Sequence, residues 1–160
     1  MTDSAKKNIL TVAVVASIML LMVIIKVYYR SMTEFNIGEE AFKKQEINEA
    51  ITHFERSIHW YTPFNRYVAG SAERLWEIGE NAEKQKDTKL ALLAYRSLRS
   101  SFYAVRSFYT PYKEWINKCD EKISSLVAAQ DTPFESEKKK SFEQRKAESL
   151  KILKTDRAPD

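Results

Sequence analysis

The stretch that decides the fold is residues 9–25, which read ILTVAVVASIMLLMVII. It carries no charge, and only Thr11 and Ser17 are mildly polar. A helix of this length spans about 25 Å, close to the ~30 Å hydrocarbon core of a bilayer. The run is followed by the basic and aromatic residues typical of a membrane–water interface: Lys26, Tyr28, Tyr29 and Arg30. We predict a transmembrane helix over residues 9–29 that contacts the lipid bilayer.

Two other structures share this kind of apolar run. A buried core helix is one, but a core helix of so small a protein normally carries a polar stripe. The other is a cleaved signal peptide, for which Lys6 and Lys7 make a suitable basic start. A cleavable signal ends in small residues, whereas Lys-Val-Tyr-Tyr-Arg follows this run. We therefore expect an uncleaved anchor, with a secreted helical module released by cleavage as the alternative.

The composition points to a helical domain behind the anchor. The 160 residues include only three Gly and four Pro, which favours long helices over a turn-rich β fold. A net charge of +4 is too small to indicate a nucleic-acid partner. Cys119 is the single cysteine, so the chain forms no internal disulfide.

Apolar residues recur every three or four positions from residue 37 to about residue 130. Prolines at 63, 111 and 133 interrupt this pattern, and a turn is expected at Glu46–Asn48. We predict an all-α chain whose later helices cover about 70–86, 88–108 and 112–129. The expected division is an N-terminal arm over 1–8, the membrane helix over 9–29, a linker over 30–36, a helical domain over 37–130 and a charged, partly ordered tail over 131–160.

Two segments, residues 37–54 and 78–95, repeat each other in sequence. In both, a glycine (Gly38, Gly79) is followed by two alanines and an aromatic residue at the same spacings: Ala41, Ala50 and Phe54, and Ala82, Ala91 and Tyr95. Glycine and alanine let two antiparallel helices approach closely, and the aromatic ring fills the space between helix pairs. A second echo relates residues 59–64 (HWYTPF) to residues 107–112 (SFYTPY).

Residues 38–58, GEEAFKKQEINEAITHFERSI, resemble a tetratricopeptide repeat. The second unit matches at fewer positions: Leu75, Gly79, Ala82, Asp87, Ala91 and Tyr95. The distance along the chain from Gly38 to Gly79 exceeds the usual period of about 34 residues. The resemblance implies about two helical hairpins with a capping helix behind them, and a scaffold for protein–protein interaction without catalytic chemistry.

Residues for catalysis or cofactor binding are scarce. His53 and His59, the only histidines, stand six apart on a predicted helix and cannot share a metal ion as an i, i+4 pair does. The sequence has no glycine-rich phosphate loop and no nucleophile motif. We predict neither an enzyme nor a bound cofactor or metal.

Two groups of residues are candidates for partner binding. One is a basic stripe on a single helix face: Arg96, Arg99, Tyr103 and Arg106. It pairs with an acidic stripe at Glu73, Glu77 and Glu80, is simply solvated, or meets an acidic peptide or anionic lipid headgroups. The other group is aromatic and surrounds the two Tyr-Thr-Pro segments: Trp60, Tyr61, Phe64, Tyr67, Phe108, Tyr109, Tyr112 and Trp115. These rings either anchor the loops or form a hot-spot patch for a partner.

We predict a membrane-anchored scaffold or accessory subunit of a membrane protein complex. A structural subunit packed into a larger membrane enzyme is the alternative, because Ala13, Ala16 and Ser17 let membrane helices approach closely. Basic residues are nearly balanced across the anchor, but a short basic arm before one apolar run is typical of a signal anchor. We expect a bacterial inner-membrane protein with a cytoplasmic N-terminus and a periplasmic helical domain.

Overall fold

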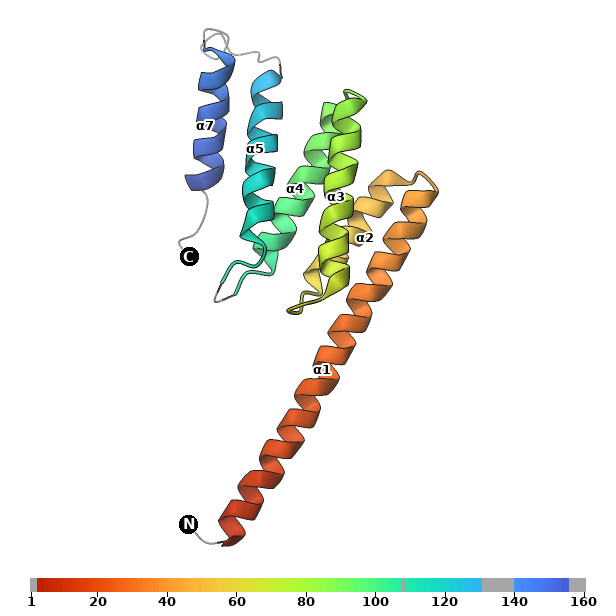
Figure 1. The fold of residues 1–160 in the computed structure, drawn as a ribbon, viewed down its shortest axis with the longest axis vertical. Coiled ribbons are helices and arrows are strands. Elements are labelled where there is room, and N and C mark those ends of the chain that lie inside the picture. Colours follow the sequence, from red (N-terminus) through yellow and green to blue (C-terminus); the bar gives the residue numbers. More distant parts are fainter. Residues whose placement is uncertain (1–2, 108, 131–139, 156–160) are drawn as a thin grey trace.

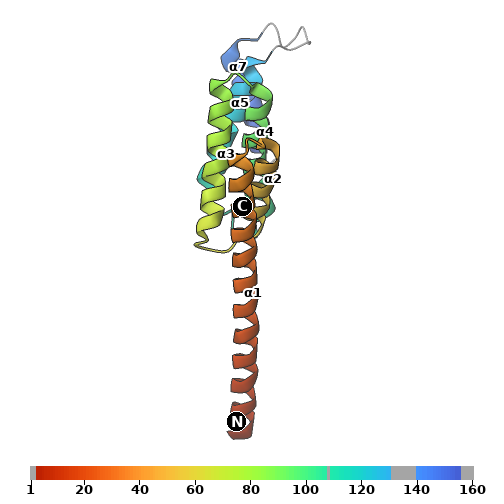
Figure 2. The same ribbon diagram turned by 90° about the vertical axis from the view of Figure 1, so that its right-hand side faces the viewer.

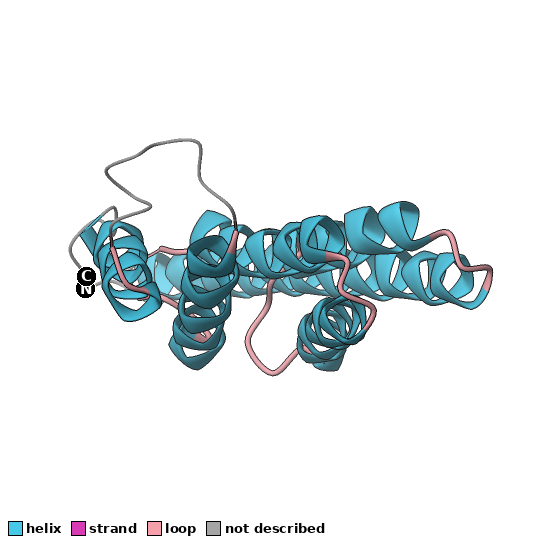
Figure 3. Ribbon diagram, turned by 90° about the horizontal axis from the view of Figure 1, so that it is seen from above, coloured by secondary structure: helices cyan, strands magenta, loops and turns pink. Residues whose placement is uncertain are grey.

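The computed structural model describes residues 3–107, 109–130 and 140–155. This part of the chain is all-helical, without a β-strand (Figure 3). Two parts of the tail, residues 131–139 and 156–160, lie outside the described residues. So do Phe108 of the aromatic group and Pro133, which was expected to interrupt the helical pattern. The helices are α1 (Asp3–Lys43), α2 (Ile47–His59), α3 (Arg66–Lys84), α4 (Thr88–Ala104), α5 (Lys113–Ala129) and α7 (Phe142–Thr155).

Helix α1 runs without a break from the apolar stretch into the helical domain (Figures 1 and 2). Its N-terminal part projects from the domain and is the one helix in the described residues that is long and apolar enough to cross a membrane. The linker that we expected over residues 30–36 is therefore helical. Neither glycine nor proline occurs between residues 3 and 37 to end the helix.

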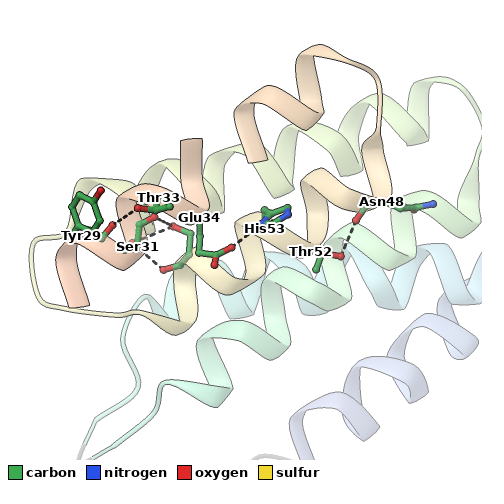
Figure 4. Close-up of polar contacts among 8 residues, drawn as sticks. Tyr29, Ser31, Thr33, Glu34, Asn48, Thr52 and His53 are labelled. Carbon is green, nitrogen blue, oxygen red and sulfur yellow. Dashed lines mark hydrogen bonds and ion pairs between the residues drawn. The ribbon is translucent and has the colours of Figure 1, made fainter. Parts of the chain in front are cut away.

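The segment that replaces the linker packs against α2. Ser31 and Ser57 are both buried, and each hydroxyl donates to the other residue's carbonyl oxygen over 3.0 Å. One turn further along α1, Glu34 and His53 lie 2.8 Å apart, oxygen to nitrogen (Figure 4). The Phe35 ring packs on Phe54 of α2 and completes this face of α1. Ser31, Glu34 and Phe35 stand at positions i, i+3 and i+4, so their side chains lie on one face of the helix. The segment can therefore remain helical and pack this face against α2.

The same turn closes the α1–α2 and α3–α4 pairs. Gln45 and Lys86 adopt left-handed backbone conformations, with φ of 64° and 61°. At the first turn, the amide of Glu46 donates to the carbonyl of Ala41 over 3.0 Å; at the second, the amide of Asp87 donates to Ala82 over 2.9 Å. This is the Schellman pattern that ends many helices, usually with glycine in the left-handed position. The first turn covers residues 44–46, slightly before the expected one, and the sequence repeat is also a repeat in backbone conformation.

Both repeat glycines face an aromatic ring. A Cβ atom added to Gly38 would lie 2.8 Å from the Phe54 ring, and one added to Gly79 would lie 2.5 Å from the Tyr95 ring. Phe54 and Tyr95 are fully buried. The small residues of the repeat thus stand where the ring of the partner helix occupies the space of a side chain.

The remaining helices extend the core away from the anchor. Ile116, Cys119 and Ile123 of α5 are buried and join the core formed by α1 to α4. Helix α7 then packs along α5, although none of its residues is buried. The partly ordered tail of our prediction therefore contains a helix over 142–155.

Three helix boundaries differ from the expected ones. Helix α3 begins at Arg66 because the Asn65 side chain accepts a hydrogen bond from the Tyr67 amide and caps it. Helix α4 ends at Ala104, about one turn before the expected end. Helix α5 begins at Lys113, since Tyr112 has a left-handed backbone with φ of 52°.

Candidate functional site

The aromatic residues of the two Tyr-Thr-Pro loops divide into anchoring and exposed rings. The hydroxyls of Tyr61 and Tyr109 lie 2.8 Å apart and join the two loops. Tyr112 packs edge-on against Tyr61 and stacks on Phe102 with ring centroids 5.0 Å apart. Burial, followed by the bond to Tyr109, raises the pKa of Tyr61, and burial likewise raises the pKa of Tyr112. These rings hold the loops together.

Three rings of this group face solvent, and Tyr109 is one of them although its hydroxyl joins the two loops. Phe64 is 100% exposed, Tyr109 is 55% exposed and Trp60 is 38% exposed. Phe64 also has a left-handed backbone, with φ of 62°. Phe64 and Tyr112 occupy the same place in the two echoed segments and share this conformation, but of the two only Tyr112 packs against the core. We call Trp60, Phe64 and Tyr109 the aromatic edge.

The basic stripe does not act as one surface. Arg99 donates from Nε to Asp120 over 2.6 Å and from a terminal nitrogen to the carbonyl of Leu153 over 2.9 Å, so it joins α4 to α5 and α7. Arg99 and Arg106 both lie over the Tyr103 ring, with guanidinium carbons 4.8 and 6.0 Å from its centroid. Arg96 and Arg106 are exposed.

The acidic stripe makes different contacts from the ones we expected. Glu77 pairs with Arg74 on its own helix over 2.7 Å, and Arg74 also makes a two-point contact with Glu39 of α1. This contact raises the pKa of Arg74 and joins α3 to α1. The sequence analysis missed Arg74 and Asp120 because Glu39 of α1, which pairs with Arg74, and Arg99 of α4, which pairs with Asp120, lie on other helices far along the chain.

A groove of about 790 Å³ lies between α4, α5 and α7. Arg96, Arg99 and Arg145 contribute guanidinium groups to its lining. The lining also has apolar side chains from α5 and α7: Ile123, Val127, Ile152 and Leu153. Glu148 also lines the groove and Arg99 is paired with Asp120, so Arg96 and Arg145 are the cations that suit an amphipathic acidic segment beside the apolar surface.

Metal and thiol chemistry find little support in the described residues. Within 3–107, 109–130 and 140–155, no three His, Cys, Asp or Glu side chains are grouped to hold a metal ion. Burial raises the pKa of the Cys119 thiol to about 12, so the thiol stays protonated and unreactive at neutral pH. His53 is engaged by Glu34.

Comparison with known proteins returned no matching family model, no matching curated protein and no matching solved structure. Over the residues that it describes, the structure defines the class: an all-α protein in which one N-terminal helix is long and apolar enough to cross a membrane.

Proposed function

We propose that this chain is a membrane-anchored scaffold or accessory subunit that presents a tetratricopeptide-like helical domain to other proteins of a membrane complex. The observation that carries the proposal is the continuity of α1, whose apolar part leads directly into the α1–α2 pair. A helix without a linker holds the domain at a fixed height above the bilayer, as a scaffold for membrane partners requires.

The repeated hairpin supports the tetratricopeptide-like assignment. The two pairs share a Schellman turn and a glycine-against-ring contact at matching positions of the sequence repeat. Helix α5 then covers the second pair, in the place of a capping helix. Function in this class of fold lies in surfaces, and we assign partner binding to the groove that Arg96 lines, with an acidic segment of a protein as its ligand.

The proposed location is the bacterial inner membrane, with the N-terminus in the cytoplasm and the helical domain in the periplasm. Lys84 at the end of α3 is exposed and far from the anchor, so Lys84→Cys provides a reporter that buried Cys119 cannot provide. An impermeant maleimide should label this variant on intact spheroplasts. Labelling that requires lysis of the inner membrane would place the domain in the cytoplasm.

The test of scaffold function compares two charge reversals on α4. The full chain is extracted from membranes in mild detergent, purified by an affinity tag and analysed for co-purifying chains. Arg96→Glu should lose a partner that Lys89→Glu, an equal charge change on the same helix outside the groove, retains. Cross-links from that partner should map to α4, α5 or α7. A chain that purifies alone, or a partner that both variants retain, would contradict the proposed groove.

A structural subunit of a larger membrane enzyme is a second candidate. A shallow depression lined by Ala13, Ser17 and three larger apolar residues runs along the exposed part of α1. Small residues at i and i+4 allow close helix packing in a membrane. Ala13→Leu with Ser17→Leu should dissociate such a complex and leave a groove-bound partner in place.

A further inference from the structure

The aromatic edge lies at the end of the domain from which the anchor emerges. The α2–α3 loop (residues 60–65) and the described parts of the α4–α5 loop (105–107 and 109–112) are at this end, whereas the α1–α2 and α3–α4 turns are at the opposite end (Figures 1 and 2). Both loops therefore face the side on which α1 continues towards its N-terminus.

A chain of contacts sets the height of these loops relative to the anchor. Tyr28, just beyond the end of the uncharged run, packs edge-on against Tyr67 with centroids 5.5 Å apart. Arg66 lies 4.8 Å above the Tyr67 ring and donates to its hydroxyl over 2.9 Å. These two residues immediately follow the α2–α3 loop, and Tyr61 of that loop bonds to Tyr109 of the other. The interfacial end of the anchor is thus joined to the start of α3, next to the α2–α3 loop, and that loop is joined in turn to the α4–α5 loop.

The edge has the composition of a membrane interface. Phe64 combines complete exposure with a left-handed backbone, and neither feature stabilises a domain in water. Trp60 and Tyr109 are amphipathic rings of the kind that gather at the headgroup level. Three exposed cations lie on the segments that carry or adjoin these loops: Arg66 at the start of α3, Arg106 in the α4–α5 loop and Arg30 at the interfacial end of the anchor. They are placed to meet anionic phosphates.

We infer that the aromatic edge docks into the headgroup region of the bilayer that α1 crosses, with Phe64 entering the upper acyl chains and Arg66 meeting phospholipid phosphate. The inference rests on the anchor of the proposed function. The surface that the aromatic edge contacts is anionic phospholipid, because the edge is continuous with the anchor and carries basic side chains. Anchor and loops together would contact the membrane at separate points and restrict tilting of the domain.

The test uses nitroxide labels on the full chain in nanodiscs of phosphatidylcholine and phosphatidylglycerol. Labels are placed by Pro63→Cys, next to Phe64, by Ile18→Cys within the anchor and by Lys84→Cys at the far end of α3. The unaltered chain, treated with the same reagent, is the control for labelling of Cys119, which is buried. Oxygen concentrates in lipid and a nickel chelate stays in water, so their collision rates with each label report its surroundings.

We expect the oxygen-to-nickel collision ratio at position 63 to exceed that at position 84 several-fold, and the ratio at position 18 to be highest. In the Pro63→Cys chain, Phe64→Glu should bring the ratio down to that of position 84, whereas Phe64→Trp should preserve it. Because Phe64 is fully exposed, these variants should melt as the parent does.

Two results would overturn the inference while leaving the anchor intact. One is a lipid signal at position 18 with an aqueous signal at position 63. The other needs a second measurement in native membranes. If position 63 is protected there from both reagents but is not protected in nanodiscs, another protein covers the edge, and the edge is a protein interface. An aqueous signal at position 18 would refute the anchor and the docking together.

Discussion

Arg99 and Asp120 form an ion pair across the α4–α5 contact, with 2.6 Å between Nε and the carboxylate, and the Asp120 side chain is 0% exposed. A buried carboxylate depends on such a partner because it has lost its hydration. The pair explains why the basic stripe is not one binding surface. Arg99 stabilises the fold, whereas Arg96, on the preceding turn of α4, is free to serve the groove surface.

Removing Arg99 should therefore cost far more stability than removing Arg96. Arg99→Leu removes a charged partner of the buried Asp120 carboxylate, and we expect a loss of about 3 kcal/mol, the lower end for a broken buried pair. Arg96→Leu should change the free energy of unfolding by less than about 0.5 kcal/mol. Denaturant titration of the full chain in mild detergent, followed by tryptophan fluorescence, measures both. Equal effects would mean that Asp120 is adequately held by other groups.

Adding one carbon at a repeat glycine should destabilise its hairpin. Gly79→Ala places a Cβ atom against the Tyr95 ring and Gly38→Ala against the Phe54 ring, and overpacking of this kind costs about 1–3 kcal/mol. Gly70→Ala is the matched control, since its Cβ atom would lie 3.0 Å from the outer edge of the Phe35 ring and alanine favours the helix. It should be affected least in the same titration. A loss at Gly70 as large as at Gly79 would contradict the close-packed hairpins.

Glycine in the two Schellman turns should stabilise the protein. Gln45→Gly and Lys86→Gly remove the steric cost of a left-handed backbone, and each should raise the free energy of unfolding by about 0.5–1 kcal/mol. Lys84→Gly, in the last turn of α3, should instead lower it. Thermal melting followed by circular dichroism compares the three. Destabilisation by Lys86→Gly would show that its side chain has a structural role.

Stability should fall in alkali partly through Cys119. Burial raises the pKa of this thiol from 9.0 to about 12, so the unfolded chain releases its proton first as the pH rises. The contribution is fully present below about pH 9 and is lost by about 1.4 kcal/mol per pH unit towards pH 12. Buried Tyr95, whose pKa is also raised by burial and by its bond to Glu83, adds to the loss.

Cys119→Ala isolates the thiol contribution. Denaturant titrations between pH 9 and pH 11 should show a shallower decline for this variant than for the unaltered chain. Ser125→Ala, a change of similar size on the same helix, should keep the original slope. Identical slopes in all three chains would mean that the thiol does not govern the alkaline transition.

Local pattern was sufficient for the helical class and for the repeat. The uncharged run, the recurrence of apolar residues and the matched spacings after Gly38 and Gly79 can be read along the chain, and each reappears in α1, in the hairpin helices and in the paired turns. The sequence analysis expected a linker at 30–36 and did not show that it is helical and packed, because Ser31, Glu34 and Phe35 form no clear apolar stripe until Ser57, His53 and Phe54 of α2 are placed against them.

For the candidate sites, too, some features can be read along the chain and others depend on how distant helices pack. The sequence by itself determined which residues are basic or aromatic, that Tyr61 and Tyr109 occupy echoed loops, and that the arginines share a helix face. Only the tertiary structure decided that Arg99 belongs to the buried Asp120, that Tyr112 packs against the core while Phe64 faces solvent, and that Tyr28 packs on Tyr67 next to the α2–α3 loop. Charge pairing and burial depend on which distant helices meet, and helical periodicity carries no information about that choice.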